Sequence, residues 1–205
     1  MNKNETRIEY DRFYRRKPQK WTSDERNEYA RKQIEEYLEG DLPKSFLDVG
    51  CGNGHTIKYL SQYWTNTKFY GFDLSPVAIE TAKTAVPDAH FQTSFLDEAS
   101  YSMQFHVVAL LGVIEHIEDI QAGLAHIKSL MAKNGIVYIE APNCLAYEGS
   151  TPEESYRRVN FGNRQMEWHL KRATWINHFE RAGMKVAASI YGTTPQTEFI
   201  FILER

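Results

Sequence analysis

The sequence predicts an α/β fold with a doubly wound, mostly parallel sheet of seven strands, and three observations lead to this prediction. From residue 45 onward, short apolar runs alternate with stretches whose apolar residues recur with a helical period. The connections between them are short, and glycine or proline marks several boundaries. A chain of 205 residues also has the length of one domain with a small addition. Alternation of this kind is typical of βαβ units, whose strands are parallel.

The first part of the alternation contains three predicted strands and two predicted helices. Ser75 is a suitable cap for the second of these helices, and Pro76 fits its first turn. The predicted strands are residues 45–50, 67–73 and 90–93, and the helices are residues 54–64 and 75–85.

The second part begins with the most apolar run of the chain, FHVVALL, which predicts a buried strand. The last two predicted strands are joined by only six residues, too few for a helical crossover, so we expect them to pair antiparallel. The predicted strands are 105–111, 135–141, 184–190 and 197–204; the helices are 119–133, ended by Asn134 and Gly135, and 173–183, ended by Gly183.

Two segments lie outside this alternation. Residues 1–44 are an N-terminal extension with an amphipathic helix predicted over 21–40. The first 20 residues are polar and basic. We expect the basic stretch 12–20 to be a solvated tail, or the N-terminal extension to be a cover over the cofactor and substrate. Within the α/β domain of residues 45–205, residues 142–172 are an insertion with several aromatic residues. Such an insertion favours a lid over a substrate; the alternative is a packed surface segment.

The composition excludes several classes of protein. A net charge of -3, with 42% hydrophobic and 25% charged residues, is that of an ordinary globular domain. Cys51 and Cys144 lie far apart without metal-ligand spacing, so neither a disulfide framework nor a structural zinc site is expected. The apolar run over 107–114 is too short to span a bilayer, and the first residues lack the apolar core of a signal peptide. We therefore expect a cytoplasmic protein.

The strongest chemical signal is FLDVGCGNGHTI, in which a predicted strand passes through a glycine-rich turn into a helix. Glycines let the backbone approach a ligand closely, and a helix start supplies free amide groups. Asp73 ends the next predicted strand, where an acid can hold the two hydroxyls of a ribose. Dinucleotide-binding turns read GxGxxG, whereas this one reads DxGxGxG. The extra carboxylate, Asp48, suits a cationic amine better than a pyrophosphate.

These residues resemble motif I of the class I S-adenosylmethionine-dependent methyltransferases, and GFDLSPVAIETAK resembles the next motif of that family. The resemblance is close from about residue 45 to 141 and extends to the end of the chain in topology. It implies a Rossmann-like methyltransferase fold with strand order 3-2-1-4-5-7-6 and an antiparallel last strand. It also implies S-adenosylmethionine as the cofactor.

The resemblance assigns roles to individual residues. Asp48 would lie near the amino group of the methionine part, Asp73 would hold the ribose, and Leu74 would lie against the adenine. The family often has an acid beside the adenine, where this chain has Ser94 or Phe95. Leu111 and Gly112 would face the methionine carboxylate and sulfonium. The turn that would wrap the methionine part consists of Gly50, Cys51, Gly52, Asn53 and Gly54.

A third signal, GVIEHIED, resembles the segment after strand four of small-molecule methyltransferases. Quinone-pathway O-methyltransferases carry ExxEH there and bind a divalent metal. Gly112 replaces the first Glu, so only Glu115 and His116 remain, and we expect no metal. His116 is the candidate general base, with Glu115 beside it as a second catalytic candidate. The alternative is that both residues only orient the following helix.

We therefore predict methyl transfer from S-adenosylmethionine to a small molecule, at oxygen. Two alternatives stay open. One is an RNA or protein methyltransferase that docks through the basic residues 12–20, and the other is a non-catalytic cofactor-binding subunit. The absence of a strong positive charge favours a small acceptor without nucleic acid or membrane, bound by a monomer or homodimer. The predicted substrate-binding residues are Tyr14, Tyr147, Trp168 and His169.

Overall fold

A computed structural model describes residues 2–17, 22–143, 155–158, 166–192 and 198–205 and divides the chain into two compact units, 1–102 and 103–205. The seven-stranded sheet has the order β3-β2-β1-β4-β5-β9-β8. Strands β6 and β7 form a separate two-stranded sheet. Strands β8 and β9 are therefore the sixth and seventh strands of the large sheet in chain order. The order is therefore the predicted 3-2-1-4-5-7-6, and the predicted fold class is confirmed.

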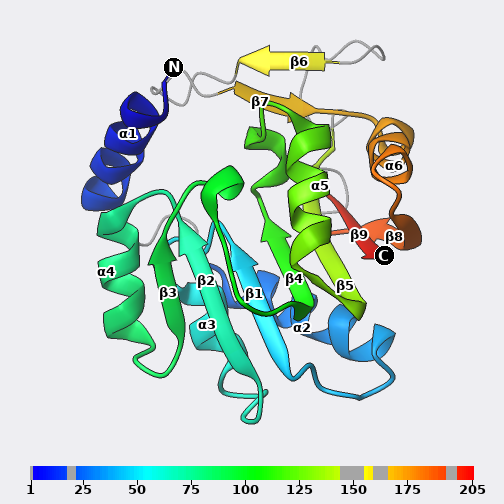
Figure 1. Ribbon diagram of the computed structural model, residues 1–205, viewed down its shortest axis with the longest axis horizontal. Helices are drawn as coiled ribbons and strands as arrows, with labels where there is room; N and C mark the ends of the chain where they lie inside the picture. The colour runs from blue at the N-terminus through cyan, green and yellow to red at the C-terminus, as the bar shows by residue number, and fades with distance from the viewer. Residues whose placement is uncertain (1, 18–21, 144–154, 159–165, 193–197) are drawn as a thin grey trace. The chain divides into compact units, whose positions relative to one another are not determined.

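The first unit contains three parallel strands and the helices that accompany them (Figure 1). Helix α4 packs on β2 and β3, α3 packs on β2, and α2 packs on α3. The strands are β1 (Ser45–Val49), β2 (Lys68–Asp73) and β3 (His90–Thr93). The helices are α1 (Lys3–Arg16), α2 (Asp24–Tyr37), α3 (His55–Leu60) and α4 (Pro76–Ala85), and a 3-10 turn, η1, covers Leu96–Glu98.

Local signals in the sequence explain several of these boundaries. The Ser75 hydroxyl accepts a hydrogen bond from the Ala78 amide at 3.2 Å, and Pro76 is the first residue of α4, as predicted. Helix α3 is shorter than predicted and ends at Leu60, because the chain turns there and brings Trp64 into the core. The Trp64 indole lies edge-on to the Phe46 ring, with 5.7 Å between the ring centroids.

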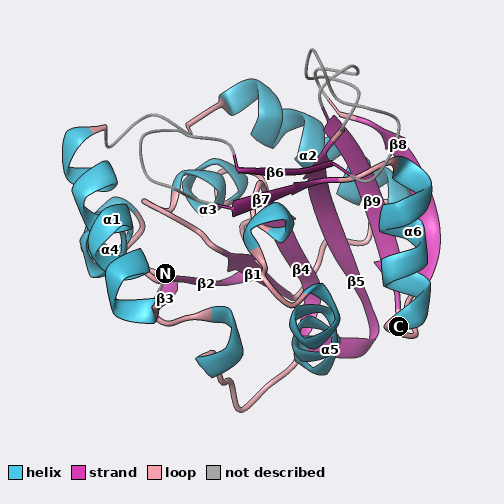
Figure 2. Ribbon diagram, turned by 90° about the horizontal axis from the view of Figure 1, so that it is seen from above, coloured by secondary structure: helices cyan, strands magenta, loops and turns pink. Residues whose placement is uncertain are grey.

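Residues 12–16 of the basic stretch belong to α1, so the expectation of a solvated tail is wrong for them. The side chains of Asn2 and Glu5 each accept a hydrogen bond from the other's backbone amide at 3.0 Å, which is a complete capping box. The helix has no fully buried residue. A helix that buries so little needs no pronounced apolar stripe, and its sequence pattern is correspondingly weak. Figures 1 and 2 show α1 beside α4, with which it makes contacts.

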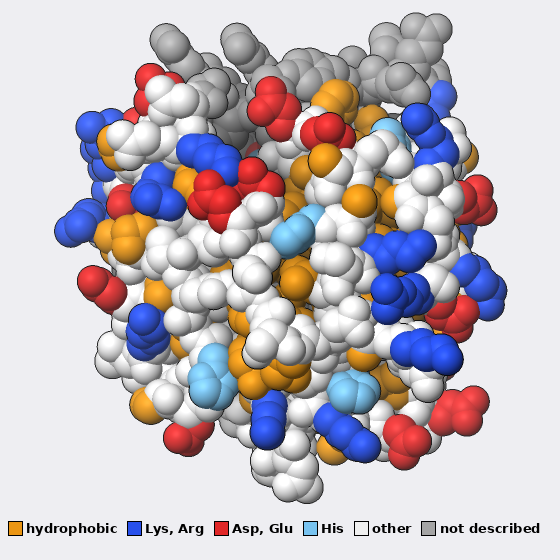
Figure 3. Space-filling model, viewed as in Figure 1, with side chains coloured by type: hydrophobic (Ala, Val, Ile, Leu, Met, Phe, Trp, Pro, Cys, Tyr) orange, Lys and Arg blue, Asp and Glu red, His pale blue; other side chains and the backbone are white. Residues whose placement is uncertain are grey.

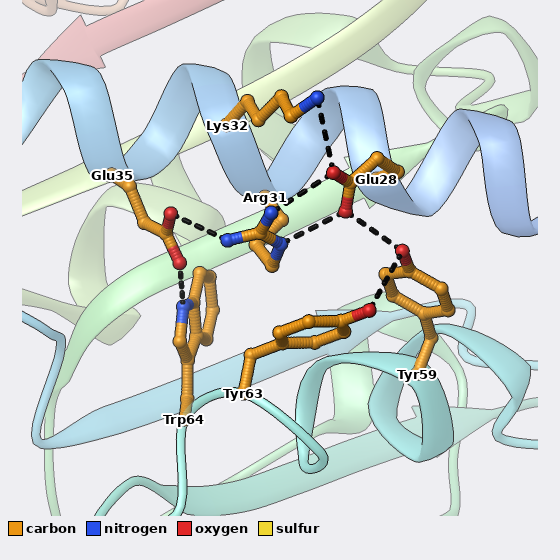
Figure 4. A network of polar contacts seen from close by, with 7 residues as sticks. All are labelled: Glu28, Arg31, Lys32, Glu35, Tyr59, Tyr63 and Trp64. Carbon is orange, nitrogen blue, oxygen red and sulfur yellow. Dashed lines mark hydrogen bonds and ion pairs between the residues drawn. The ribbon is translucent and has the colours of Figure 1, made fainter.

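Helix α2 is held to the α3 region by a network of polar contacts (Figure 4). The Tyr59 hydroxyl donates to Glu28 at 2.7 Å, and the Trp64 indole N–H donates to Glu35 at 2.8 Å. Arg31 bridges the two carboxylates, at 3.0 Å from Glu28 and 2.6 Å from Glu35. The network therefore fixes α2 over the helix that follows the glycine turn.

The second unit contains four strands of the large sheet and the two-stranded pair. Strand β5 is parallel to β4 and antiparallel to β9, and β8 is antiparallel to β9 at the edge, as predicted for the last two strands. The strands are β4 (Phe105–Leu111), β5 (Met131–Pro142), β6 (Ser155–Arg158), β7 (Met166–His169), β8 (Lys185–Tyr191) and β9 (Glu198–Glu204). The helices are η2 (Ile114–His116, 3-10), α5 (Ile120–Leu130) and α6 (Arg172–Arg181).

Two predicted boundaries of the second unit are corrected. Helix α5 ends at Leu130 and not at residue 133, because Met131 is extended and pairs with Phe105 of β4. Asn134 and Gly135 consequently lie within β5. Residues 142–172, predicted as an insertion that forms a lid over a substrate or a packed surface segment, include the antiparallel strands β6 and β7, which lie side by side in Figure 2.

The core of the second unit consists of apolar strand residues and of aromatic side chains from α6. Trp175 and Phe179 are fully buried, and the Phe179 ring lies 5.0 Å from that of Phe201 on β9. Burial of such side chains contributes about 1.5–3 kcal/mol each. Among the described helices, none combines the length and the apolar character needed to cross a bilayer.

Candidate functional site

The turn after β1 has a backbone that only glycine adopts easily. Gly52 and Gly54 have φ angles of 53° and 78°, in the left-handed region. A side chain on Gly52 would bring its Cβ to 2.7 Å from the Tyr14 hydroxyl, and one on Gly54 would meet Ala82 at 3.0 Å. The Cys51 amide donates to Phe72 of β2 at 3.0 Å, which ties the turn to the neighbouring strand. A side chain at Gly52 or Gly54 would therefore both strain the backbone and meet neighbouring atoms.

Asp73 is the centre of a set of hydrogen bonds at the end of β2. Its carboxylate accepts from the Gly52 amide at 3.0 Å and from the Ser75 amide at 2.9 Å. Burial raises the pKa of Asp73 to about 6, while the hydrogen bonds from Ser75, Gly52 and Tyr14 act in the opposite direction. The structure therefore joins the two motifs, the glycine turn and Asp73, through the amide of Gly52.

Asp48 is buried at the end of β1, with 3% of its surface exposed. Burial raises the pKa of Asp48 to about 7, the nearby charge of Asp73 adds to the rise, and the positive charge of Arg26 opposes it. A cation close to Asp48 would be strongly attracted to its ionised form. Arg26, on α2, was not among the residues predicted for the site.

Tyr14 brings α1 to the glycine turn. Its hydroxyl is hydrogen-bonded to Asp73, and burial together with this acid holds the pKa of Tyr14 well above its usual value. The Ser75 hydroxyl donates to Asp11, also on α1. The predicted substrate-binding residue Tyr14 therefore lies among the residues predicted to bind the cofactor.

Leu74, Ser94 and Phe95 lie at the ends of β2 and β3, and α1 contacts this edge as well. The Ser94 amide donates to the Asp73 carbonyl at 2.9 Å, and Arg7 donates to the Leu74 carbonyl at 3.1 Å. The Arg7 guanidinium lies 4.9 Å from the centre of the Phe95 ring. This edge presents an aromatic ring and backbone groups where the family often has an acid.

The remaining residues of the turn are Gly50, Cys51 and Asn53. Asn53 is half-buried, Gly50 has a φ angle of 67°, and Cys51 is buried. Burial raises the pKa of the Cys51 thiol well above its usual value, so this thiol stays protonated and unreactive at neutral pH.

In the second unit, the chain leaves β4 through Leu111 and Gly112 and enters η2. Gly112 has a φ angle of 67°, which allows the sharp change of direction. Glu115 is buried, whereas the side chain of His116 is 27% exposed. The imidazole of His116 is therefore accessible, in contrast to the adjacent carboxylate.

Strand β7 brings two further ionisable residues to His116. The Nε2 atom of His116 lies 3.9 Å from Glu167 Oε1, and the Nε2 atom of His169 lies 3.0 Å from Glu167 Oε2. Trp168 donates from its indole nitrogen to the Ile117 carbonyl at 2.9 Å, beside His116. The predicted residues His116, Trp168 and His169 are thus brought together, and Glu167 was missed. Its position two residues before His169 in a strand, on the same face, was the available signal.

Two further predictions concern Tyr147 and a metal ion. Tyr147 lies outside the described residues. Among those described, no group of three or more His, Cys, Asp or Glu side chains has an arrangement able to hold a metal ion.

Comparison with known proteins identifies the family. The family model described as a methyltransferase domain matches residues 21–196. The chain belongs to the methyltransferase domain family. The structure of this methyltransferase resembles that of the 1,6-didemethyltoxoflavin-N1-methyltransferase of Burkholderia thailandensis, solved with 1,6-didemethyltoxoflavin and S-adenosylhomocysteine, at a TM-score of 0.80. The two chains are 15% identical, over 98% of this methyltransferase and 88% of the other.

Two sequence relatives are methyltransferases of small molecules by name. Trans-aconitate 2-methyltransferase of Enterobacter sp. (strain 638) is 28% identical over 103 residues, which are 50% of this methyltransferase and 41% of the relative. Demethylmenaquinone methyltransferase of Chlorobaculum parvum is 27% identical over 114 residues, 55% of this methyltransferase and 47% of the relative. The methyltransferase thus spans less than half the length of either relative.

S-adenosylmethionine is the cofactor of this class, and the geometry of the first unit fits it. The buried carboxylate of Asp48 suits its cationic amino group. The carboxylate of Asp73 already accepts hydrogen bonds from a hydroxyl and two amides, and it can accept them equally from ribose hydroxyls. A side chain on Gly52 would meet the Tyr14 hydroxyl, so glycine is required for so close an approach to the backbone of the turn.

Proposed function

We propose that this chain transfers the methyl group of S-adenosylmethionine to a hydroxyl oxygen of a small-molecule acceptor. The observation that carries the choice of oxygen is the half-exposed imidazole of His116, with a carboxylate close behind it. A hydroxyl must lose a proton when it is methylated, and an imidazole is the side chain best suited to take it near neutral pH.

The chain itself contributes binding, orientation and proton transfer. S-adenosylmethionine supplies a methyl group that its sulfonium makes electrophilic. Asp48 and Asp73 hold the amino and ribose groups of the cofactor, while Tyr14 closes the site from α1. Neutral His116 would accept the proton of the acceptor hydroxyl while the oxygen bonds to the methyl carbon and the methyl–sulfur bond breaks, which would leave S-adenosylhomocysteine and a protonated imidazole. Correct orientation of two reactants can contribute about 7–11 kcal/mol to lowering a barrier.

Part of the basic charge of α1 is engaged within the first unit, which favours a small acceptor over RNA. Lys3 lies 2.7 Å from Asp97, and Arg12 lies 2.7 Å from Glu9. On the face drawn in Figure 3, the described basic side chains are interspersed with acidic ones. Both relatives described above and the bacterial N1-methyltransferase are named for small molecules, which supports the same conclusion.

The test combines binding with turnover. We expect calorimetry to show binding of S-adenosylmethionine and S-adenosylhomocysteine. The protein is then incubated with ¹³C-methyl cofactor and a panel of phenols, carboxylic acids, amines and a short RNA. The chemical shift of the transferred methyl distinguishes oxygen from nitrogen. Tighter binding of a nicotinamide dinucleotide, or methylation of RNA or amines alone, would contradict the proposal. Cofactor binding without turnover on any acceptor would favour a non-catalytic subunit.

A further inference from the structure

Glu167 and His169 have no role in the function proposed above, yet both are buried beside His116. His169 is 1% exposed and Glu167 8%. The two oxygens of Glu167 face different imidazoles, since Oε1 is the atom nearest His116 and Oε2 the atom nearest His169. One carboxylate therefore lies between an accessible and an inaccessible imidazole.

The strand positions this carboxylate firmly. Glu167 and His169 are two residues apart on β7 and so lie on one face of it. The backbone of β7 is paired with β6, and the Trp168 indole is anchored to the Ile117 carbonyl at 2.9 Å. Strand β7 is thereby held by β6 and, next to Glu167, by the residue that follows η2.

The hydrogen bond from His169 fixes the orientation of the carboxylate. An ionised carboxylate can only accept hydrogen bonds, so the 3.0 Å contact requires a proton on Nε2 of His169. A neutral imidazole with its proton on Nε2 meets this requirement without placing a second buried charge. The other oxygen, Oε1, consequently remains directed at His116.

The distance of 3.9 Å between Glu167 and His116 is too long for a hydrogen bond with neutral imidazole but short enough for a strong charge interaction. The other acids on elements packed against η2 are Glu115 of η2 itself and Glu140 of β5, both buried. Only Glu167 forms an ion-pair contact with His116 among the described residues.

We propose that Glu167 is a positioning residue that stabilises the protonated form of His116, and that His169 holds Glu167 in place. This inference rests on the proposed function, in which His116 takes the proton of the acceptor. When the acceptor O–H bond breaks, the proton moves to His116, and the positive charge that appears on the imidazole is balanced by Glu167. No other reactant is needed.

The decisive variant is Glu167→Gln, which keeps the shape of the side chain and removes its charge. We expect about tenfold slower turnover at pH 7 with unchanged cofactor affinity, and an acidic limb of the pH–rate profile that moves to lower pH. Glu167→Asp should restore part of the rate. Glu204→Gln is the matched control, because Glu204 pairs with Lys185 at 2.8 Å on an exposed edge, and its replacement should change neither quantity.

A second readout does not depend on turnover. In ¹⁵N spectra of the histidine rings, the Nε2–H signal of His169 should be shielded from solvent exchange in the wild type and altered in Glu167→Gln. At a fixed pH near 6.5, the protonated fraction of His116 should be lower in the variant. Unchanged histidine spectra, or an unchanged pH–rate profile, would overturn the inference, as would a parallel loss of rate, cofactor binding and thermal stability.

The variant His116→Ala separates this inference from the proposed function. If His116→Ala is as active as the wild type, the assignment of the base fails and the role of Glu167 fails with it. If His116→Ala is inactive and Glu167→Gln is normal in rate and spectra, only the role of Glu167 fails.

Discussion

The glycine turn of the first unit and the surroundings of His116 in the second are assembled from different kinds of contact. Asp73 accepts from backbone amides of Gly52 and Ser75, which belong to two short motifs. His116 instead contacts the side chain of Glu167, 51 residues later in the chain, on a separate hairpin. A site made from backbone groups needs only a strand, a turn and glycines, whereas a site made from side chains depends on how a hairpin is placed.

From this difference we infer that the two regions contribute to different steps, the turn to cofactor binding and the surroundings of His116 to turnover. In the proposed function the turn binds the cofactor through backbone groups, which do not depend on side-chain identity. The residues around His116 act through their side chains, so their contacts depend on the identity of each residue. We therefore expect changes at the turn to act on cofactor affinity and changes near His116 to act on turnover. The following predictions test that division, from the largest expected effect to the smallest.

Replacing His116 with Ala should lower turnover by about 10²–10⁴-fold, because no other described side chain in that position can accept the acceptor proton. Cofactor affinity, measured by calorimetry, should stay within about twofold of the wild type. His126→Ala, at a half-buried histidine of α5, serves as the control and should leave the rate unchanged. A His116→Ala enzyme that loses cofactor affinity as well would break the proposed division.

Gly52→Val should weaken cofactor binding by about 5- to 150-fold, which corresponds to about 1–3 kcal/mol of steric conflict. The new Cβ would lie 2.7 Å from the Tyr14 hydroxyl, and the branched side chain would be held at a φ of 53°. Gly40→Val is a matched control, because Gly40 also has a positive φ but nothing lies within 4 Å of its Cβ position. The control should lose thermal stability but retain affinity; equal affinities in both variants would show that Gly52 is remote from the cofactor.

The affinity for S-adenosylmethionine should rise about tenfold between pH 6 and pH 7.5. The pKa of Asp48 is raised to about 7 by burial, so in the free protein much of this acid is protonated below pH 7. The cationic amino group binds the ionised carboxylate, so binding releases a proton and strengthens as pH rises through this range. Calorimetry in buffers of different ionisation enthalpy measures the proton directly. In Asp48→Asn the affinity should be weaker and its pH dependence much reduced; an unchanged slope would contradict the assignment.

The smallest effect is expected at the network of α2, away from both sites. The pKa of Glu28 is lowered from the usual 4.5 to about 2 by hydrogen bonds from Arg31, Tyr59 and Lys32. Its contribution to stability is therefore present above about pH 4.5 and is lost as pH falls through 2. Glu28→Gln should lower the midpoint of thermal unfolding by at most about 2–4 °C at pH 7, with turnover unchanged. The difference from the wild type should disappear in acid; a constant difference would show that charge is not involved.

Local features of the sequence were sufficient to predict the strands and much of the cofactor turn. The apolar run of β4 and the strand β3 begin and end at the predicted residues, and Ser75 with Pro76 starts α4 as predicted. These features depend on the apolar pattern of a short segment, on helix caps and on φ angles, and each of these is set by residues close together in the sequence. Helix α1 was missed because its apolar pattern is weak, although the pair Asn2 and Glu5 forms a recognisable capping box.

Only the tertiary structure decided which polar side chains meet. Nothing in the sequence near His116 indicates Glu167, because their contact depends on the position of β7. In the same way, α1 brings Tyr14 to Asp73, a residue 59 positions later, and α2 brings Arg26 near Asp48. The physical reason is that strand and helix signals come from the chain's own periodicity and conformational preferences. Contacts between distant side chains depend instead on packing that sequence order alone does not specify.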